Sequence, residues 1–230
     1  MKTLTQELQN EGMARRQFLR YAGTGAAVMA GVLTMASCSK DHAASVVNDH
    51  VDLGSGDIAI LNYAYALEQL EAAFYTQVAA TPYSNQSTYE KALLTDIRDH
   101  EVAHREFFKA ALGGNAIPGL TPNFSSINFS DRTSVLGAAK AFEDLGVSAY
   151  NGAGYMIKDV NYLALAGKIV SVEARHASLI RNLIAPGSFA DSTVIDANGL
   201  DGAKSPQQVV PIANTYLSGK KILAPALGIY

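Results

Sequence analysis

The sequence predicts an all-α protein whose main domain is a four-helix bundle, made of two antiparallel helical hairpins joined by a long crossover. Four long helical patterns follow residue 56, and strand-like alternation is almost absent. These patterns are roughly 24–28 residues long, which is long for a globular protein and typical of a bundle. The connections after the first and third patterns are short and the one after the second is long, which gives two hairpins and one crossover.

Caps and helix breakers set the expected boundaries. Asp57 is predicted to cap the first helix, and Ser130 or Asp131 the third. Glycine and proline residues end the second and fourth helices. The bundle is expected over residues 57–185, with helices at about 57–80, 87–112, 131–157 and 160–185. Residues 186–230 are predicted to be a loop-rich C-terminal extension with one short helix at about 206–217.

The N-terminal region, residues 1–37, is predicted to be a twin-arginine-type lipoprotein signal peptide. Arg15 and Arg16 precede Phe-Leu-Arg and an apolar run that glycines interrupt, so a permanent membrane span is the poorer interpretation. The stretch Met-Ala-Ser-Cys38 resembles a lipobox, although leucine is usual where Met35 stands. The alternative is a lone cysteine in an ordinary signal peptide.

Acylation of Cys38 would anchor the chain to a membrane at the periplasmic side or the cell surface. The polar residues 38–56 are expected to form a tether. A net charge of −3 gives no electrostatic case for binding nucleic acid. A single cysteine excludes an intramolecular disulfide.

Each predicted helix carries a glutamate within an apolar stretch, and the second and fourth helices add a histidine three residues later. The resulting candidate metal ligands are Glu68, Glu101, His104, Glu143, Glu173 and His176. Residues i and i+3 lie on one helix face, so a Glu-x-x-His pair can reach a metal in the core. Four carboxylates and two imidazoles match a di-metal carboxylate site, and two divalent cations balance the four negative charges. The sequence therefore predicts two metal ions per chain, either iron or manganese.

The two halves of the bundle also resemble each other. Glu68 is followed seven residues later by Tyr75, and Glu143 seven residues later by Tyr150. This internal similarity is typical of two related hairpins that face each other across a pseudo-two-fold axis.

With these residues in place, the sequence resembles the ferritin-like superfamily, including bacterioferritins, rubrerythrins and manganese catalases. The stretch from Leu61 through Leu67-Glu68 to Tyr75 is similar to a first bacterioferritin-type helix, and Glu-Ala-Arg-His176 to the E-x-R-H form of di-iron proteins. The secretion signal and the LEQLEAAFY stretch resemble the bacterial exported "ferritin-like domain" group, which includes desiccation-related proteins. The resemblance covers about residues 57–185.

Several neighbouring residues are candidates to assist the ligands, each with an ordinary structural alternative. Tyr75 and Tyr150 could bond to ligands or pack in the core, and His100 could support a ligand or be partly exposed. Asp144 and Arg175 could orient ligands or form a surface ion pair. Glu71, one turn after Glu68, is either an alternative ligand or an exposed charge.

The resemblance implies an exported di-metal oxidoreductase that acts on peroxide, O₂ or Fe²⁺ in stress protection. The alternative is a non-enzymatic stress-related scaffold with a structural metal or none. Glu101 and Glu173 would lie between the metals, and the other four ligands would be terminal. The expected partners are the membrane, through the lipid anchor, and a small oxidant or metal ion. A homo-oligomer stays open, although a tethered subunit fits poorly into a closed storage shell.

Overall fold

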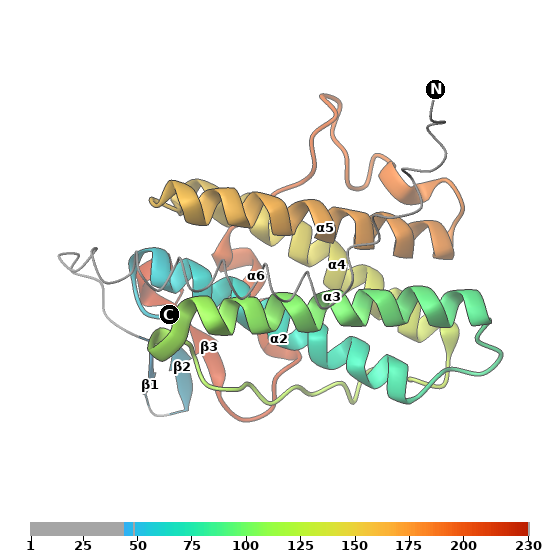
Figure 1. Ribbon diagram of the computed structural model, residues 1–230, viewed down its shortest axis with the longest axis horizontal. Coiled ribbons are helices and arrows are strands. Elements are labelled where there is room, and N and C mark those ends of the chain that lie inside the picture. Colours follow the sequence, from blue (N-terminus) through green and yellow to red (C-terminus); the bar gives the residue numbers. More distant parts are fainter. Residues whose placement is uncertain (1–43, 48, 230) are drawn as a thin grey trace, which may run out of the picture. The chain divides into compact units, whose positions relative to one another are not determined.

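The computed structural model describes residues 44–47 and 49–229, and within them the predicted all-α bundle is confirmed. The four long helices are α2 (Gly56–Ala80), α3 (Thr88–Leu112), α4 (Arg132–Ala153) and α5 (Val160–Ile184) (Figure 1). The helix α2 packs mainly against α3, and α4 packs mainly against α5. The connection from α3 to α4 is the long crossover, as the sequence predicts.

The predicted cap is confirmed at the third helix and wrong at the first. The side chains of Ser87, Asp131 and Asp159 accept backbone N–H groups in the first turns of α3, α4 and α5. The prediction that Asp57 caps the first helix is wrong, because Ser55 occupies the N-cap position of α2. Asp57 instead accepts the backbone N–H groups of residues 158 and 159, at 2.9 and 2.8 Å. It therefore ties the start of α2 to the start of α5.

The third helix is shorter than predicted. The helix α4 ends at Ala153, and a 3₁₀ turn, η2 (Gly154–Met156), covers most of the remaining expected residues. Further 3₁₀ turns are η1 (Gly113–Asn115), η3 (Ser188–Ala190) and η4 (Pro225–Leu227).

The crossover is fixed to α2 by two buried amide side chains. Asn62 donates to the carbonyl oxygens of Leu53 and Asn115, and accepts from the backbone N–H of Ile117 at 2.9 Å. Gln69 accepts from the backbone N–H of Leu120 at 2.8 Å. These contacts satisfy backbone groups of a segment that has little secondary structure of its own.

A small sheet joins the segment before α2 to the C-terminal extension. The strands are β1 (Ser45–Val47), β2 (His50–Asp52) and β3 (Lys221–Leu223), in the order β1-β2-β3. The strand β2 pairs antiparallel with β1 and parallel with β3. Val51 and Leu53 are buried, so the predicted tether is wrong for this part of residues 38–56. Strands of three residues are too short for alternation to reveal them.

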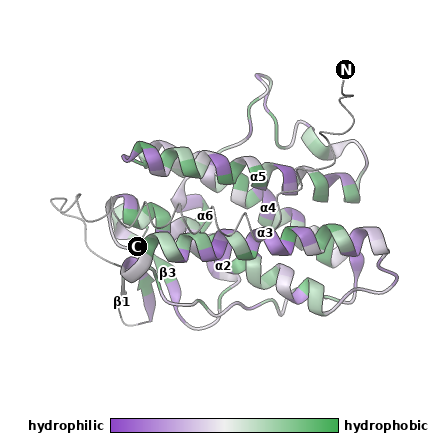
Figure 2. Cartoon of the chain, viewed as in Figure 1, coloured by the Kyte–Doolittle hydropathy of each residue, from purple (hydrophilic) through white to green (hydrophobic). Residues whose placement is uncertain are grey.

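The remaining helix of the extension, α6 (Pro206–Thr215), begins where the sequence places it and ends slightly earlier. Apolar side chains from α6, the sheet and η4 join the core, including Val209, Ile222 and Leu227. The extension is therefore part of the folded unit. Hydrophobic and hydrophilic residues are interspersed along the long helices that it contacts (Figure 2).

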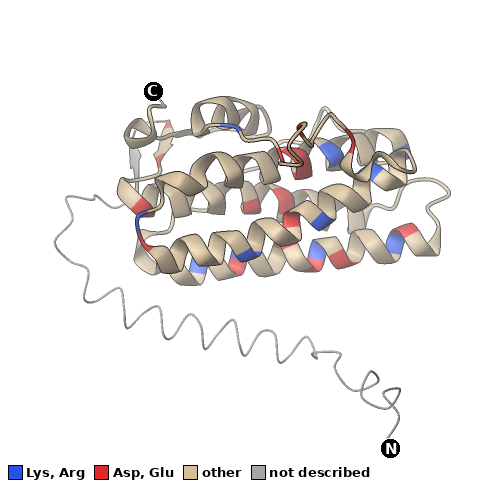
Figure 3. Cartoon of the chain, turned by 90° about the horizontal axis from the view of Figure 1, so that it is seen from above, with Lys and Arg blue, Asp and Glu red and all other residues tan. Residues whose placement is uncertain are grey.

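The helix α2 is the central element of the bundle. Most of its residues are buried, because α3, α4, α6 and the crossover surround it. Acidic residues nevertheless lie on helices in the middle of the bundle as well as on its outside (Figure 3). Among the described residues, no helix has a stretch long and apolar enough to cross a membrane.

Candidate metal centre

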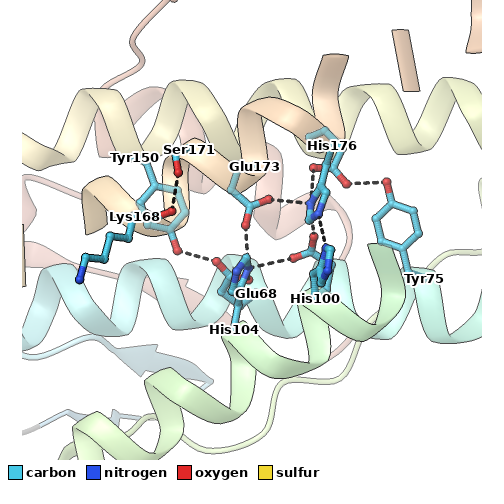
Figure 4. A network of polar contacts seen from close by, with 11 residues as sticks. Glu68, Tyr75, His100, His104, Tyr150, Lys168, Ser171, Glu173 and His176 are labelled. Atoms are coloured by element: carbon cyan, nitrogen blue, oxygen red, sulfur yellow. Dashed lines mark hydrogen bonds and ion pairs between the residues drawn. The ribbon is translucent and has the colours of Figure 1, made fainter. Parts of the chain in front are cut away.

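The six predicted ligands meet in the middle of the bundle, with at least one contributed by each long helix (Figure 4). They form two groups, within each of which the nearest ligand atoms all lie within 4.8 Å of one another. One group is Glu68, Glu101, His104 and Glu173, and the other is Glu101, Glu143, Glu173 and His176. Glu101 and Glu173 belong to both groups, which is the arrangement expected of carboxylates shared between two metal ions.

The distances repeat across the two groups. His104 Nδ1 lies 2.7 Å from Glu173 Oε1 and 3.5 Å from Glu68 Oε2. His176 Nδ1 lies 2.7 Å from Glu101 Oε1 and 3.6 Å from Glu143 Oε2. Each imidazole therefore contacts the shared carboxylate of the opposite helix and the terminal carboxylate of its own group.

The atoms that face one another in the centre are not hydrogen-bonded. Both oxygens of Glu101 and of Glu173, one oxygen each of Glu68 and Glu143, and both Nδ1 atoms are buried without a hydrogen-bond partner. Some of these pairs are as close as 2.7 Å, yet their angles do not suit a hydrogen bond. Burying so many unpaired polar atoms costs roughly 1–3 kcal/mol for each group. Lone pairs that converge without bonding to each other fit a pair of cations.

Two tyrosines hold the terminal carboxylates from the other side. Tyr75 on α2 donates its hydroxyl to Glu143 Oε1 at 2.5 Å, and Tyr150 on α4 donates to Glu68 Oε1 at 2.5 Å. Burial, followed by the charges of nearby carboxylates, raises the pKa of both tyrosines, so both remain donors. In each terminal carboxylate, one oxygen is bound by tyrosine and the other faces the centre.

Without bound cations, protons must balance the buried charge. Burial raises the pKa of Glu101 to about 8 and that of Glu143 to about 7. Burial alone would lower the pKa of His176, but its contacts with Glu101 and other carboxylates raise it to about 12. The pKa of His104 is also raised, by Glu68, Glu101 and Glu173, against the effect of burial. Divalent cations that bind here would therefore displace protons.

Glu173 differs from the other carboxyl groups of the centre. Burial would raise its pKa, but its contacts with His104 and His176 outweigh burial and lower the pKa to about 2. Glu173 therefore stays ionised in the absence of metal, between the two imidazolium rings.

Of the three other residues predicted to support the ligands, only one contacts a ligand. His100 is exposed, and its Nδ1 lies 2.9 Å from Nε2 of His176. Asp144 does not orient a ligand, because Arg181 binds it through two hydrogen bonds of 2.7 Å. Arg175 is exposed on α5. The predicted supporting role is therefore consistent with the position of His100 but not with those of Asp144 and Arg175.

Glu71 is neither the alternative ligand nor the exposed charge that the sequence suggests. Its residue is 3% exposed, and it belongs to neither ligand group. Burial, followed by the charges of Glu101 and Glu173, raises its pKa well above the ordinary value, which favours the protonated form of the carboxyl. A side chain at Gly146 would meet the carboxyl, because a Cβ there would lie 2.9 Å from Glu71 Oε1. One sequence signal existed, since Gly146 follows Glu143 by three residues as Glu71 follows Glu68.

Arg181 is the other buried charge that the sequence did not reveal. It lies at 4% exposure and binds Asp144 on α4 and Thr193 in the C-terminal extension. These contacts fix the extension against the α4–α5 hairpin. Arg181 and Asp144 are far apart in the sequence, so no local pattern predicts their salt bridge.

Fold and site together define a class of protein: a four-helix bundle that carries carboxylate and imidazole groups suited to two metal ions at its centre. The family model for the ferritin-like domain matches residues 56–186. The chain therefore belongs to the ferritin-like domain family. No curated protein matches the chain.

Proposed function

We propose that this protein is an exported, lipid-anchored oxidoreductase that holds two iron or two manganese ions and acts on peroxide, O₂ or Fe²⁺. The observation that carries the proposal is the pair of ligand groups that share Glu101 and Glu173. Bound iron or manganese would supply the redox chemistry, while the protein supplies binding, orientation and electrostatics.

Charge supports two cations rather than one. Each ligand group holds three carboxylates and one imidazole, and the shared pair reduces the total to four carboxylates. Two divalent cations balance these four charges, whereas one would leave two negative charges in a core where the carboxylates are 0% exposed. Oxygen and imidazole ligands suit iron and manganese alike, so the proposal includes both metals.

The protein's own residues would hold the centre in a fixed shape. Tyr75 and Tyr150 restrict the terminal carboxylates to one orientation. Rotation of these carboxylates would break a buried hydrogen bond to a charged group, which costs about 1.5–3 kcal/mol. The unpaired oxygens of Glu68 and Glu143 therefore stay directed at the centre.

Access for a small substrate is most direct from the imidazole side. The side chains of His104 and His176 are 11% and 5% exposed, whereas those of the four carboxylates are 0% exposed. Exposed His100 lies against His176. A molecule as small as peroxide, O₂ or a metal ion would have the shortest path to the centre between α3 and α5.

Export and lipid attachment rest on the sequence of residues 1–38, which lies outside the described residues. The twin-arginine pattern and the position of Cys38 support both. Multiple acyl chains on Cys38 would hold the protein stably on a membrane, whereas one chain would not. Intact-mass measurement on protein from the membrane fraction tests this, with Cys38→Ser as the control. A wild-type mass without acyl groups would refute lipid attachment.

The first test of the metal centre is the metal content of the full chain, compared with a Glu101→Ala/Glu173→Ala variant. We expect about two iron or manganese ions per chain in the wild type, in line with known centres of this kind, and none in the variant. Glu106→Ala is the matched control, since Glu106 is exposed on the same helix, α3. Turnover with hydrogen peroxide, and O₂ consumption with Fe²⁺, then distinguish the substrates.

The same measurements separate the enzyme from a non-enzymatic scaffold. Bound metal without turnover of any of the three substrates would favour the scaffold. No bound metal, even after anaerobic addition of Fe²⁺ or Mn²⁺, would refute the metal centre.

A further inference from the structure

The two ligand groups match closely except at the outer edges of their imidazoles. His100 on α3 lies four residues before His104, but its ring contacts the histidine of the other group. His100 Nδ1 lies 2.9 Å from His176 Nε2, and the two rings are nearly parallel, with centroids 5.2 Å apart and an interplanar angle of 11° (Figure 4).

Pseudo-symmetry identifies the residue that should do the same for His104. The tyrosine contacts exchange α2 with α4, since Tyr75 binds Glu143 and Tyr150 binds Glu68. The same exchange relates α3 to α5, so the counterpart of His100 is the residue four before His176. That residue is Val172, which has no polar side chain. The imidazole of His104 therefore has no counterpart of the His100 contact.

This difference affects how well each imidazole can serve a metal. A neutral imidazole that offers Nδ1 to a cation carries its proton on Nε2. Nε2–H of His176 can donate a hydrogen bond to Nδ1 of His100, which fixes both the tautomer and the plane of the ligand ring. A partner of this kind also raises the basicity of the ligand, and its loss typically weakens metal binding by about 10–100-fold. Val172 can do none of this for His104.

We propose that His100 is a positioning residue that makes the two metal positions unequal, so that the position formed with Glu143 and His176 binds a divalent cation more tightly than the position formed with Glu68 and His104. This inference rests on the metal centre of the proposed function. It adds an order of loading and names the residue responsible.

Three variants of the full chain test the inference by anaerobic titration with Mn²⁺ and with Co²⁺. Calorimetry gives the two affinities, and visible absorption of Co²⁺ reports the ligand environment without any need for activity. His100→Val copies the other half of the centre and should weaken the tighter step by about 10–100-fold. His100→Asn keeps an acceptor and should restore part of that loss. Val172→His adds the missing partner and should strengthen the weaker step.

Two ligand variants assign the steps to positions. Glu143→Gln should remove the tighter step, and Glu68→Gln should remove the weaker one. Because His100 is exposed, its substitution should not unfold the chain, and circular dichroism of each variant in chelator checks this.

Four outcomes would overturn the inference. The first is an unchanged tighter step in His100→Val, and the second is loss of the tighter step in Glu68→Gln. The third, two equal steps in the wild type, would refute the inequality but leave the proposed metal centre intact. The fourth, absence of any binding in the wild type, would refute the proposed metal centre as well.

Discussion

Three buried tyrosines on α2 and α4 should differ in how loss of the hydroxyl group changes the free energy of unfolding: two losses should destabilise the protein and one should not. Tyr75 and Tyr150 each donate to a carboxylate of the centre, whereas the hydroxyl of Tyr63 is buried without a hydrogen-bond partner. Replacement by phenylalanine removes one oxygen and leaves the ring, so packing is nearly unchanged in all three variants. The comparison therefore isolates the hydrogen bond.

The magnitudes follow from what each hydroxyl contacts. Tyr75→Phe and Tyr150→Phe leave Oε1 of Glu143 and of Glu68 buried without a donor, which costs about 1.5–3 kcal/mol for a hydrogen bond to a charged group. Tyr63→Phe removes an unsatisfied buried hydroxyl, so the free energy of unfolding should stay equal or rise by about 1 kcal/mol. The expected changes in the free energy of unfolding therefore differ between the variants by more than the change that an ordinary surface substitution causes.

The assay is urea unfolding of each full chain in chelator, followed by titration with Mn²⁺. In the titration, Tyr75→Phe should weaken mainly the position that contains Glu143, and Tyr150→Phe the position that contains Glu68. A loss of about tenfold in affinity corresponds to about 1.4 kcal/mol. If all three variants were equally stable and bound metal alike, the hydrogen bonds would not hold the carboxylates and the reasoning would be refuted.

Four further substitutions test the surroundings of the centre. Burial raises the pKa of Glu71, so the wild type should lose stability as the pH rises from the unfolded-state pKa of this group through its higher folded-state pKa. Glu71→Gln should remove that part of the decline, which unfolding in chelator between pH 4 and 8 measures. Parallel stability curves for the wild type and the variant would contradict this. A Cβ at Gly152 would lie 1.9 Å from the carbonyl oxygen of Lys204, so Gly152→Ala should destabilise by about 1–3 kcal/mol or more. Gly137→Ala on the same helix meets nothing within 4 Å and should stabilise by up to about 1 kcal/mol; equal melting temperatures for the two would contradict this. Arg181→Met leaves the partly buried carboxylate of Asp144 unpaired and should destabilise the protein by about 2–3 kcal/mol. Proteolysis after residue 188 should become faster. Unchanged proteolysis would show that the contact does not hold the extension.

The ligands could be predicted because their pattern is local. Glu-x-x-His places two metal-binding side chains on one helix face whatever the rest of the chain does. The same spacing occurred in two helices, and each of the other two helices carried a glutamate before a tyrosine at the same distance. Such repeated local patterns survive in the sequence, and the structure brings all six residues together.

The residues that the sequence did not place depend on contacts between distant segments. Glu71 is buried because Gly146 on another helix leaves room for it. Asp57 reads as a cap for its own helix, yet it accepts backbone groups more than a hundred residues away. Arg181 finds Asp144 across the hairpin. The partners of Asp57 and Arg181 are not marked by any short spacing, and only the comparison of the two halves of the bundle could have linked Glu71 with Gly146.

The strand pairing has a consequence for the order in which the chain can fold. His50 of β2 lies beside Lys221 of β3, so the sheet cannot be completed during synthesis until nearly the whole chain has been made. The backbone N–H of Leu53, which donates to the carbonyl oxygen of Leu223, stays without this partner until then. The bundle hairpins, whose contacts are close in sequence, can form earlier. Closure of the sheet would therefore be a late event in folding, and the proposed export of a folded chain would have to follow it.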